Sequence, residues 1–371
     1  MKRAGDEFLN FFGKFHRQCQ HYFQYLEQTY EDSRFPLRYR DPGSLEDYLH
    51  SGFNELEQRL MEVMIDEVDE ERLVELSSVK ARLAGIKDSF DFFINMRDEN
   101  FVYWLDGGIG RLSLNAAPID VAPLLKALLF DRPIPIIMTS ATLAVSGKLD
   151  YYMKRIGLEI AEQMILDSPF DFSSQAKIII PEKMPDPKDS ENFAAACREK
   201  LEYLISLTGG KAFVLFTSYR MLNQTADVMR PWFDANGWTL LKQGDGLSNL
   251  KLVDEFRKDK NSVLFGTDSF WTGIDVPGEA LSHVIIVKLP FAVPDHPVIE
   301  ARLEKITAKG GNAFMNFSVP EAVLKLRQGV GRLIRAKTDN GIISILDSRI
   351  VTKRYGYIFM KSLPDSPKEF L

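Results

Sequence analysis

Clusters of hydroxyl, glycine and guanidinium groups mark four places in the sequence that are suited to phosphate chemistry. Hydroxyls and the backbone amides of glycine-rich loops donate hydrogen bonds to phosphate oxygens, and guanidinium groups stabilise the charge that develops during phosphoryl transfer. A single hydroxyl cluster often only caps the next helix, but the four together, in this order, indicate a phosphate-handling site. The clusters lie at 139–143 (TSATL), 217–219 (TSY), 266–278 (GTDSFWTGIDVPG) and 328–335 (QGVGRLIR).

The elements that must position these clusters are strands and helices in alternation. Apolar runs of strand length precede the first three clusters, and the fourth ends an amphipathic helical pattern. This alternation is typical of βαβ units and predicts an α/β fold with a parallel sheet and helices on both faces. In such sheets the loops after the carboxyl ends of the strands bind ligands. The expected strands are 134–139, 177–180, 213–216, 263–266, 284–287 and 342–346, and the expected helices are 190–207, 220–236, 247–259 and 319–334.

The first hundred residues differ from the rest of the chain in pattern and in charge. Their apolar positions, such as Phe8, Phe11, Phe12 and Phe15, recur at helical spacing and predict a mostly helical N-terminal module. Residues 1–106 contain 22 acidic and 13 basic side chains, whereas the remainder contains 30 acidic and 33 basic ones. The formal net charge of −6 argues weakly against nucleic-acid binding. The part that contains the four clusters is nevertheless mildly basic.

Length and composition exclude several other classes of protein. The 371 residues predict two or three globular domains, and the longest apolar runs are too short to span a membrane. The N-terminus has no apolar secretory segment. The two cysteines, Cys19 and Cys197, exclude a disulfide scaffold or a four-thiolate site. We therefore expect a cytoplasmic protein in a reducing setting.

The four clusters resemble motifs III, IV, V and VI of superfamily 2 helicases, and their details resemble the DinG branch of the DinG/XPD helicases. The resemblance extends over about residues 116–364 and includes KLPF at 288–291 and LDSR at 346–349. It implies two RecA-like lobes that clamp ATP between them and move 5′→3′ along single-stranded DNA. It divides the chain into a helical arch-like insertion (1–100), the end of lobe 1 (101–168) and lobe 2 (169–371).

Motif VI of this resemblance supplies the expected catalytic residues. A guanidinium that reaches the γ-phosphate from the other lobe stabilises the transition state of phosphoryl transfer. Arg332 and Arg335 are spaced i, i+3 on the expected helix and therefore share a face, which predicts two arginine fingers. Gln328 lies about one turn earlier, where it could bond phosphate or water. The alternative is a solvated basic helix end.

The other motifs imply nucleotide, DNA and coupling contacts. In motif V, Gly273 and Asp275 are expected to bind the nucleotide, and Gly331 of motif VI is placed with them. Trp271 either stacks on a base or packs between the lobes. Arg349 either faces phosphate or pairs with Asp347. The expected DNA contacts are Thr217, Ser218, Thr267 and Trp271, and the expected coupling residues of motif III are Ser140 and Thr142.

A P-loop is missing from the sequence. The motif G-x-x-x-x-G-K-[ST] holds the β- and γ-phosphates, but none of the Gly-Lys pairs at 13–14, 147–148 and 210–211 is followed by Ser or Thr. The D-E-x-D sequence at 66–69 lies within a helical, acidic stretch, so we interpret it as a solvated helix. We therefore expect ATP and Mg²⁺ to be bound mainly by a lobe that this chain lacks, and we expect any iron–sulfur cluster to lie there too.

These patterns predict the C-terminal motor half of an ATP-dependent DNA helicase of the DinG type, with a role in DNA repair. Its expected partners are single-stranded DNA and an N-terminal half that carries the P-loop, and the chain alone is predicted to be inactive. The alternative is a non-catalytic nucleic-acid-binding or regulatory module built on a RecA-like lobe. An intact motif VI favours the first interpretation, because a binding module does not need residues that reach a γ-phosphate.

Overall fold

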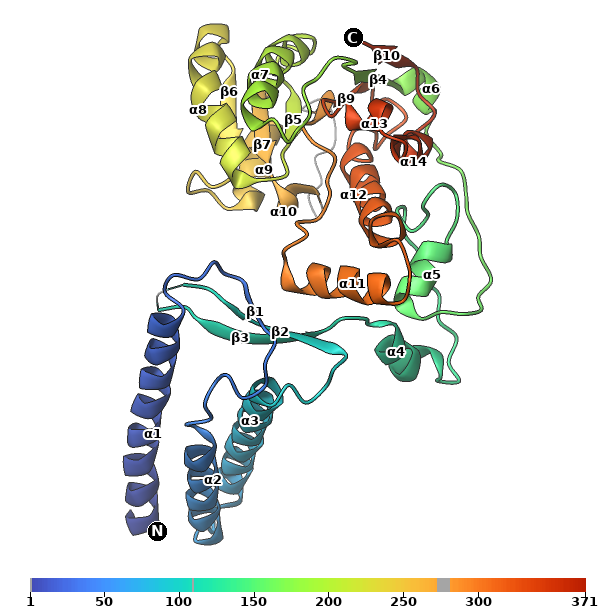
Figure 1. Cartoon of the computed structure of the whole chain (residues 1–371). Helices are drawn as coiled ribbons and strands as arrows, with labels where there is room; N and C mark the ends of the chain where they lie inside the picture. Colours follow the sequence, from blue (N-terminus) through green and yellow to red (C-terminus); the bar gives the residue numbers. More distant parts are fainter. Residues whose placement is uncertain (1, 109, 272–280) are drawn as a thin grey trace. The chain divides into compact units, whose positions relative to one another are not determined.

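The computed structural model describes residues 2–108, 110–271 and 281–371, and the chain divides into two compact units (Figure 1). The first unit contains residues up to 121 together with 293–305, and the second contains 122–292 and 306–371. Helix α11 (Pro297–Ala308) therefore begins in the first unit and ends in the second. Among the residues described, no helix is both long and apolar enough to cross a membrane.

The first unit consists of three helices and a small antiparallel sheet, which confirms the predicted helical N-terminal part. Aromatic side chains fill its core, where Phe15 packs edge-on against Phe53 and Tyr39 stacks on Phe93. Arg38 and Arg40 of the sheet form ion pairs with Glu300 and Glu304 of α11, which explains why the start of this helix belongs to the unit. The helices are α1 (Lys2–Thr29), α2 (His50–Ile65) and α3 (Glu70–Ile94). The strands are β1 (Leu37–Tyr39), β2 (Phe101–Asp106) and β3 (Ser113–Pro118), and they lie in that order in the sheet.

The second unit is built on a seven-stranded parallel sheet, which confirms the predicted α/β class. The strand order is β10-β4-β9-β8-β5-β7-β6, and every neighbouring pair is parallel. All expected strands from 177 onward are present, and the edge strands β6 and β10 are additions. The strands are β4 (Ala176–Ile180), β5 (Ala212–Leu215), β6 (Thr239–Lys242), β7 (Ser262–Gly266), β8 (His283–Ile286), β9 (Gly341–Ile345) and β10 (Lys368–Phe370).

Helices cover both faces of this sheet, as Figure 1 shows. Alternate residues of each strand point to opposite faces, so the sheet has two cores. Val214 and Ile285 pack with α7 and α8, whereas Phe213 and Val284 pack with α9, α12 and α14. The helices are α7 (Ser190–Ser206), α8 (Tyr219–Asn236), α9 (Asn249–Lys258), α12 (Val319–Val330) and α14 (Gly356–Ser362).

The predicted strand at 134–139 is wrong for this structure. Residues 135–140 have no regular secondary structure, and Ile137 is 89% exposed. A parallel strand satisfies its backbone N–H and C=O groups only by pairing with neighbours. Among the described residues, no strand pairs with this run, so its apolar composition alone does not make it a strand.

Short elements connect the rest of the second unit. The segment around the missing strand is flanked by α4, a π-helix and α5, and two further short helices follow strands β7 and β9. These elements are α4 (Ala122–Leu125), η1 (Lys126–Phe130), α5 (Asp150–Ile156), α6 (Phe172–Gln175), α10 (Asp268–Trp271), η2 (Phe314–Ser318) and α13 (Arg349–Thr352).

Candidate nucleotide and nucleic-acid interface

The carboxyl edge of the seven-stranded sheet brings most of the predicted site residues together. Because β9, β8, β5 and β7 are adjacent and parallel, the residues that follow them lie along one edge. Thr217 and Ser218 follow β5, Thr267 follows β7, and Asp347 follows β9. Ser218 is exposed and caps α8, since its Oγ accepts a hydrogen bond from the Met221 amide at 3.3 Å. The helix-capping role that a hydroxyl cluster can have is therefore present at this position.

Thr267 is buried and already bonded within the protein. Its backbone N–H and its hydroxyl both donate to Oε1 of Gln243, at 2.7 and 2.9 Å. In this arrangement neither donor points to solvent, so a phosphate contact would require Thr267 to give up a bond to Gln243. Gln243 was not among the predicted site residues, although a polar residue at the end of the 239–242 run was a possible signal.

Trp271 is fully buried, which corrects the prediction that its ring stacks on a base. Its Nε1 donates to the Phe216 carbonyl at 3.1 Å, and the ring has no exposed face. Gly329 lies against it so closely that a Cβ there would be 2.9 Å from the ring. The indole packs inside the second unit, with the residues of its core.

The two arginines of motif VI lie beyond the helix that was expected to display them. Helix α12 ends at Val330, and Gly331 is its C-cap, because glycine is a poor helix former. Arg332 is only 5% exposed and donates from Nη2 to the Trp271 carbonyl at 2.6 Å. Arg335 is exposed, and its backbone N–H bonds Oδ2 of Asp339. The prediction that both arginines share one helical face is therefore wrong.

Helix α12 contacts the motif III loop through two adjacent side chains. Nε2 of Gln328 lies 3.5 Å from Oγ1 of Thr142, whose backbone N–H in turn donates to Oγ of Ser140. Arg327 donates to the carbonyls of Ala144 and Ala141, and partial burial lowers its pKa. The structure thus joins the predicted coupling residues to motif VI. Arg327 was missed because nothing in its local sequence indicates a distant carbonyl partner.

The end of β9 contains an ion pair. Asp347 is completely buried, and its carboxylate accepts two bonds from the Arg349 guanidinium, at 2.8 and 2.6 Å, and one from the Leu289 amide, at 2.8 Å. Of the two alternatives for Arg349, the structure has the ion pair. Nearby, the Lys288 ammonium lies over the Phe193 ring, and burial lowers the pKa of this lysine.

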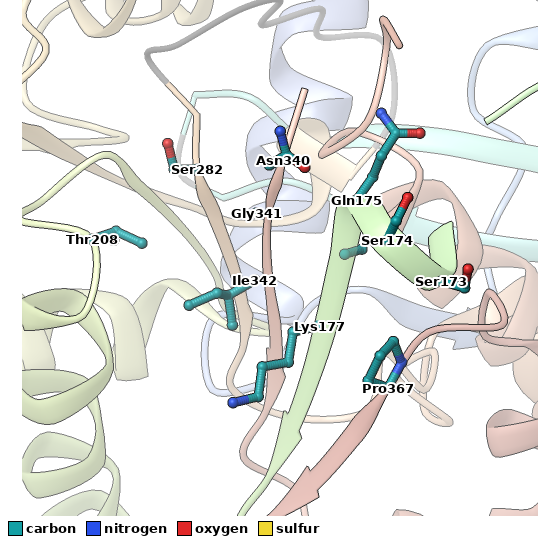
Figure 2. A pocket seen from close by; sticks show the side chains of 11 residues that line it. Ser173, Ser174, Gln175, Lys177, Thr208, Ser282, Asn340, Gly341, Ile342 and Pro367 are labelled. Atoms are coloured by element: carbon teal, nitrogen blue, oxygen red, sulfur yellow. The ribbon is translucent and has the colours of Figure 1, made fainter. Parts of the chain in front are cut away.

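Gly273 and Asp275 lie outside the described residues, and Gly331 is exposed. A shallow pocket of about 460 Å³ lies at the opposite, amino edge of the sheet, where Figure 2 shows hydroxyl and amide side chains around the starts of β4 and β9. None of the predicted site residues lines it, so we assign it no part in the candidate site.

Comparison with known proteins identifies the class. Residues 201–366 match the family described as helicase C-terminal domain. Across 97% of its length the chain is similar in fold to a structure titled XPD helicase, with a TM-score of 0.62, 16% identity and 62% of that chain covered. A second similar structure, Xpd4 of S. tokodaii, gives a TM-score of 0.59 at 12% identity, covering 93% of this chain and 64% of that one. The fold is therefore that of a RecA-like helicase lobe.

The curated relatives with similar sequences include proteins named YoaA and DinG. The chain is 39% identical to the ATP-dependent DNA helicase YoaA of Haemophilus influenzae, over 79% of this chain and 45% of that protein. It is 37% identical to the ATP-dependent DNA helicase DinG of Photobacterium profundum, over 84% of this chain and 45% of that protein. It is also 37% identical to a Bacillus subtilis protein named 3′-5′ exonuclease DinG, over 72% of this chain and 30% of that protein. The predicted relationship is confirmed, and the chain spans less than half the length of these relatives.

Proposed function

We propose that this chain supplies the C-terminal motor part of an ATP-dependent DNA helicase that moves 5′→3′ along single-stranded DNA. The observation that carries the proposal is the gathering of motif residues on one carboxyl edge of a RecA-like sheet. Relatives named ATP-dependent DNA helicases support it. In this proposal residues 1–100 are the arch-like insertion, 101–168 are the end of lobe 1, and 169–371 are lobe 2.

Arg335 is the first candidate for the arginine finger. It is exposed just beyond α12, whereas Arg332 is buried and bonded to a backbone carbonyl. A guanidinium that reaches the γ-phosphate stabilises the charge of the transition state. We propose that Arg335 makes this contact and that Arg332 joins it when its hydrogen bond to the Trp271 carbonyl opens. Gln328 would orient phosphate or water, and Gly331, Gly273 and Asp275 would contact the nucleotide.

Exposed apolar runs support the need for a completing partner. Ile137 and Ile160 are 89% and 90% exposed, and other exposed apolar residues lie near each of them in the sequence. Contiguous exposed apolar side chains of this kind mark surfaces that bind another surface. We propose that the rest of lobe 1, which carries the P-loop and binds ATP with Mg²⁺, pairs with these runs.

The test uses the chain alone and then the chain joined to a P-loop-bearing lobe 1 from a related helicase. The chain alone should bind oligo-dT, measured by fluorescence anisotropy, with an affinity that falls with added salt because phosphate contacts release counterions. It should hydrolyse no ATP above background. In the joined protein, Arg335→Ala should abolish DNA-stimulated turnover and leave oligo-dT affinity within about twofold.

Other outcomes would redirect the proposal. Turnover by the chain alone would show that a phosphate cradle exists here after all. Loss of DNA binding in Arg335→Ala would remove the finger assignment. If the joined protein binds DNA but never hydrolyses ATP, the alternative function, a non-catalytic nucleic-acid-binding module, would replace this one.

A further inference from the structure

Gln243 joins two of the predicted DNA-contacting loops through a closed set of hydrogen bonds. It follows β6 and is 5% exposed. Its Oε1 accepts from the backbone N–H and the hydroxyl of Thr267, and its Nε2 donates to Oη of Tyr219 at 2.7 Å and to Oγ of Ser269 at 2.8 Å. Asn249 also donates to Ser269, at 2.9 Å. The start of α8 and the segment that runs from Thr267 into α10 are thereby held to one buried amide.

The orientation of this amide follows from the chemistry of its partners. The backbone N–H of Thr267 can only donate, so the oxygen of Gln243 must face it. The amide nitrogen then faces two hydroxyls, each of which can accept. All four hydrogen-bonding positions of the amide are filled, and a buried polar network that is completely satisfied is rigid.

Tyr219 is held at its hydroxyl but not covered. The residue is 51% exposed although its Oη is bonded to Gln243. It begins α8 directly after Thr217 and Ser218, and the exposed Arg220 follows it. Because the bond to Gln243 already fixes the hydroxyl, the Tyr219 side chain has little conformational entropy left to lose when a ligand binds. Its ring is therefore pre-organised as a platform. Aromatic platforms beside basic residues are what single-stranded nucleic acids stack on.

We propose that Tyr219 stacks on a base of the bound single strand, and that Gln243 is the positioning residue that holds its ring. The proposal rests on the proposed function, because it assumes that single-stranded DNA follows this edge of the sheet. It also replaces Trp271, whose ring is buried, as the aromatic contact of the site.

The test compares two single-stranded probes of equal length, oligo-dT and an oligonucleotide of abasic sites, with the whole chain. Tyr219→Leu should weaken oligo-dT binding about tenfold, as expected for the loss of one stacked base. Binding of the abasic probe, which has phosphates but no bases, should stay within about twofold of wild type, and so should the dependence on salt. The matched control is Tyr203→Leu, because Tyr203 is 49% exposed on α7 and lies outside the Gln243 network. It should change neither affinity.

The positioning role has its own measurement. Tyr219→Phe keeps the ring and loses the anchor, and Gln243→Met keeps the size and loses all four bonds, so each should weaken oligo-dT binding about threefold. Combined with Tyr219→Leu, Gln243→Met should cause no further loss, because it acts through the ring. Thermal melting checks that each variant is folded.

The outcomes separate this inference from the proposed function. If the wild-type chain binds neither probe, the proposed function fails and this inference fails with it. If wild type binds oligo-dT and Tyr219→Leu binds it equally well, only this inference is overturned. Equal losses on both probes would indicate a structural role for Tyr219 and would also overturn it.

Discussion

The apolar run at 134–138 and strand β8 have similar compositions but opposite environments. All four residues of β8 are buried between β5 and β9, and each neighbour supplies a complete parallel ladder. In the 134–138 run, Ile134 and Ile137 are 53% and 89% exposed, and the backbone forms no strand. In these two runs, burial of the branched side chains and pairing of the backbone are therefore either both present or both absent. A strand of a parallel sheet is a property of its neighbours as much as of its own residues.

The largest expected effect is a matched pair of substitutions in these two runs. Ile285→Asp places a carboxylate in the core beside α7 and α8, and should destabilise the fold by several kcal/mol, enough to unfold the second unit. Ile137→Asp should change the free energy of unfolding by less than about 0.5 kcal/mol, because the side chain is already in water. Urea unfolding followed by far-ultraviolet circular dichroism measures both.

The same pair can also test the proposed partner. When the chain is joined to a P-loop-bearing lobe 1, Ile137→Asp should become destabilising, because the run would then be a buried strand. If Ile137→Asp is equally harmless in the joined protein, the run is not completed by that lobe. If it is already harmful in the chain alone, the contrast with β8 is wrong.

The second effect comes from the first residue of β8. His283 is completely buried, and desolvation lowers its pKa to about 3, so the ring is neutral in the folded protein; its Nε2 lies 2.7 Å from Oγ of Ser344. Unfolding returns the pKa to about 6.5. Below that pH the unfolded state binds a proton that the folded state does not. This group therefore favours unfolding as the pH falls from 6.5 to 3, by about 1.4 kcal/mol per pH unit, and has no effect above 6.5.

Urea unfolding of wild type and His283→Gln at several pH values isolates this group. The variant should have a shallower loss of stability below pH 6.5. His21→Gln, which replaces an exposed histidine of α1, is the control and should follow wild type. Parallel profiles for wild type and His283→Gln would mean that the buried ring accepts a proton in the folded state.

A pair of glycines gives the third, smaller effect. A Cβ at Gly329 would lie 2.9 Å from the Trp271 ring, so Gly329→Ala should destabilise the second unit by about 1–3 kcal/mol through overpacking. Gly85 lies in the interior of α3, and a Cβ there would have nothing within 4 Å. Gly85→Ala should stabilise the first unit by about 0.5–1 kcal/mol. Thermal unfolding that gives both changes the same sign would contradict this difference in packing.

The central strands could be predicted from the sequence because both of their faces are buried. Runs such as 213–216 and 284–287 are buried on both faces, and this requires continuous apolar residues. The edge strands β6 and β10 were missed, because an edge strand has one neighbour and tolerates polar residues. The prediction of a strand at 134–139 was wrong for a different reason. Its residues resemble those of a central strand, but no strand among the described residues pairs with it.

The sequence predicted which edge of the sheet holds the candidate site, but it did not predict the contacts between the side chains there. Because all strands of the seven-stranded sheet are parallel, Thr217, Thr267 and Asp347, which follow β5, β7 and β9, lie on one edge. Which side chains face each other there depends on tertiary packing, so Arg327 gave no local signal, and the polar residue after the 239–242 run did not reveal the partners of Gln243. Trp271 of motif V is buried because Gly329 leaves room for the indole to pack against α12. Arg332 of motif VI is buried beside it, because its guanidinium donates to the Trp271 carbonyl.

The smallest expected effect on stability comes from Arg327. This residue holds the loop that follows the 134–138 run. Its guanidinium donates to the carbonyls of Ala141 and Ala144, and so attaches the loop after the 134–138 run to α12. Arg327→Gln should change the free energy of global unfolding by less than about 1 kcal/mol, because the loop opens separately from the sheet. Amide hydrogen exchange should nevertheless become faster at residues 139–148, measured by mass spectrometry, and stay unchanged in β8.

The control for this prediction is Arg198→Gln, which replaces an exposed arginine of α7 and should leave exchange unchanged in both regions. Faster exchange in β8 as well would mean that the loop and the sheet open as one cooperative unit. In that case the 134–138 run would already depend on the same core as β8, and its exposure would not reflect the absence of neighbouring strands. Unchanged exchange at 139–148 would mean that Thr142 and its contact with Gln328 hold the loop without Arg327.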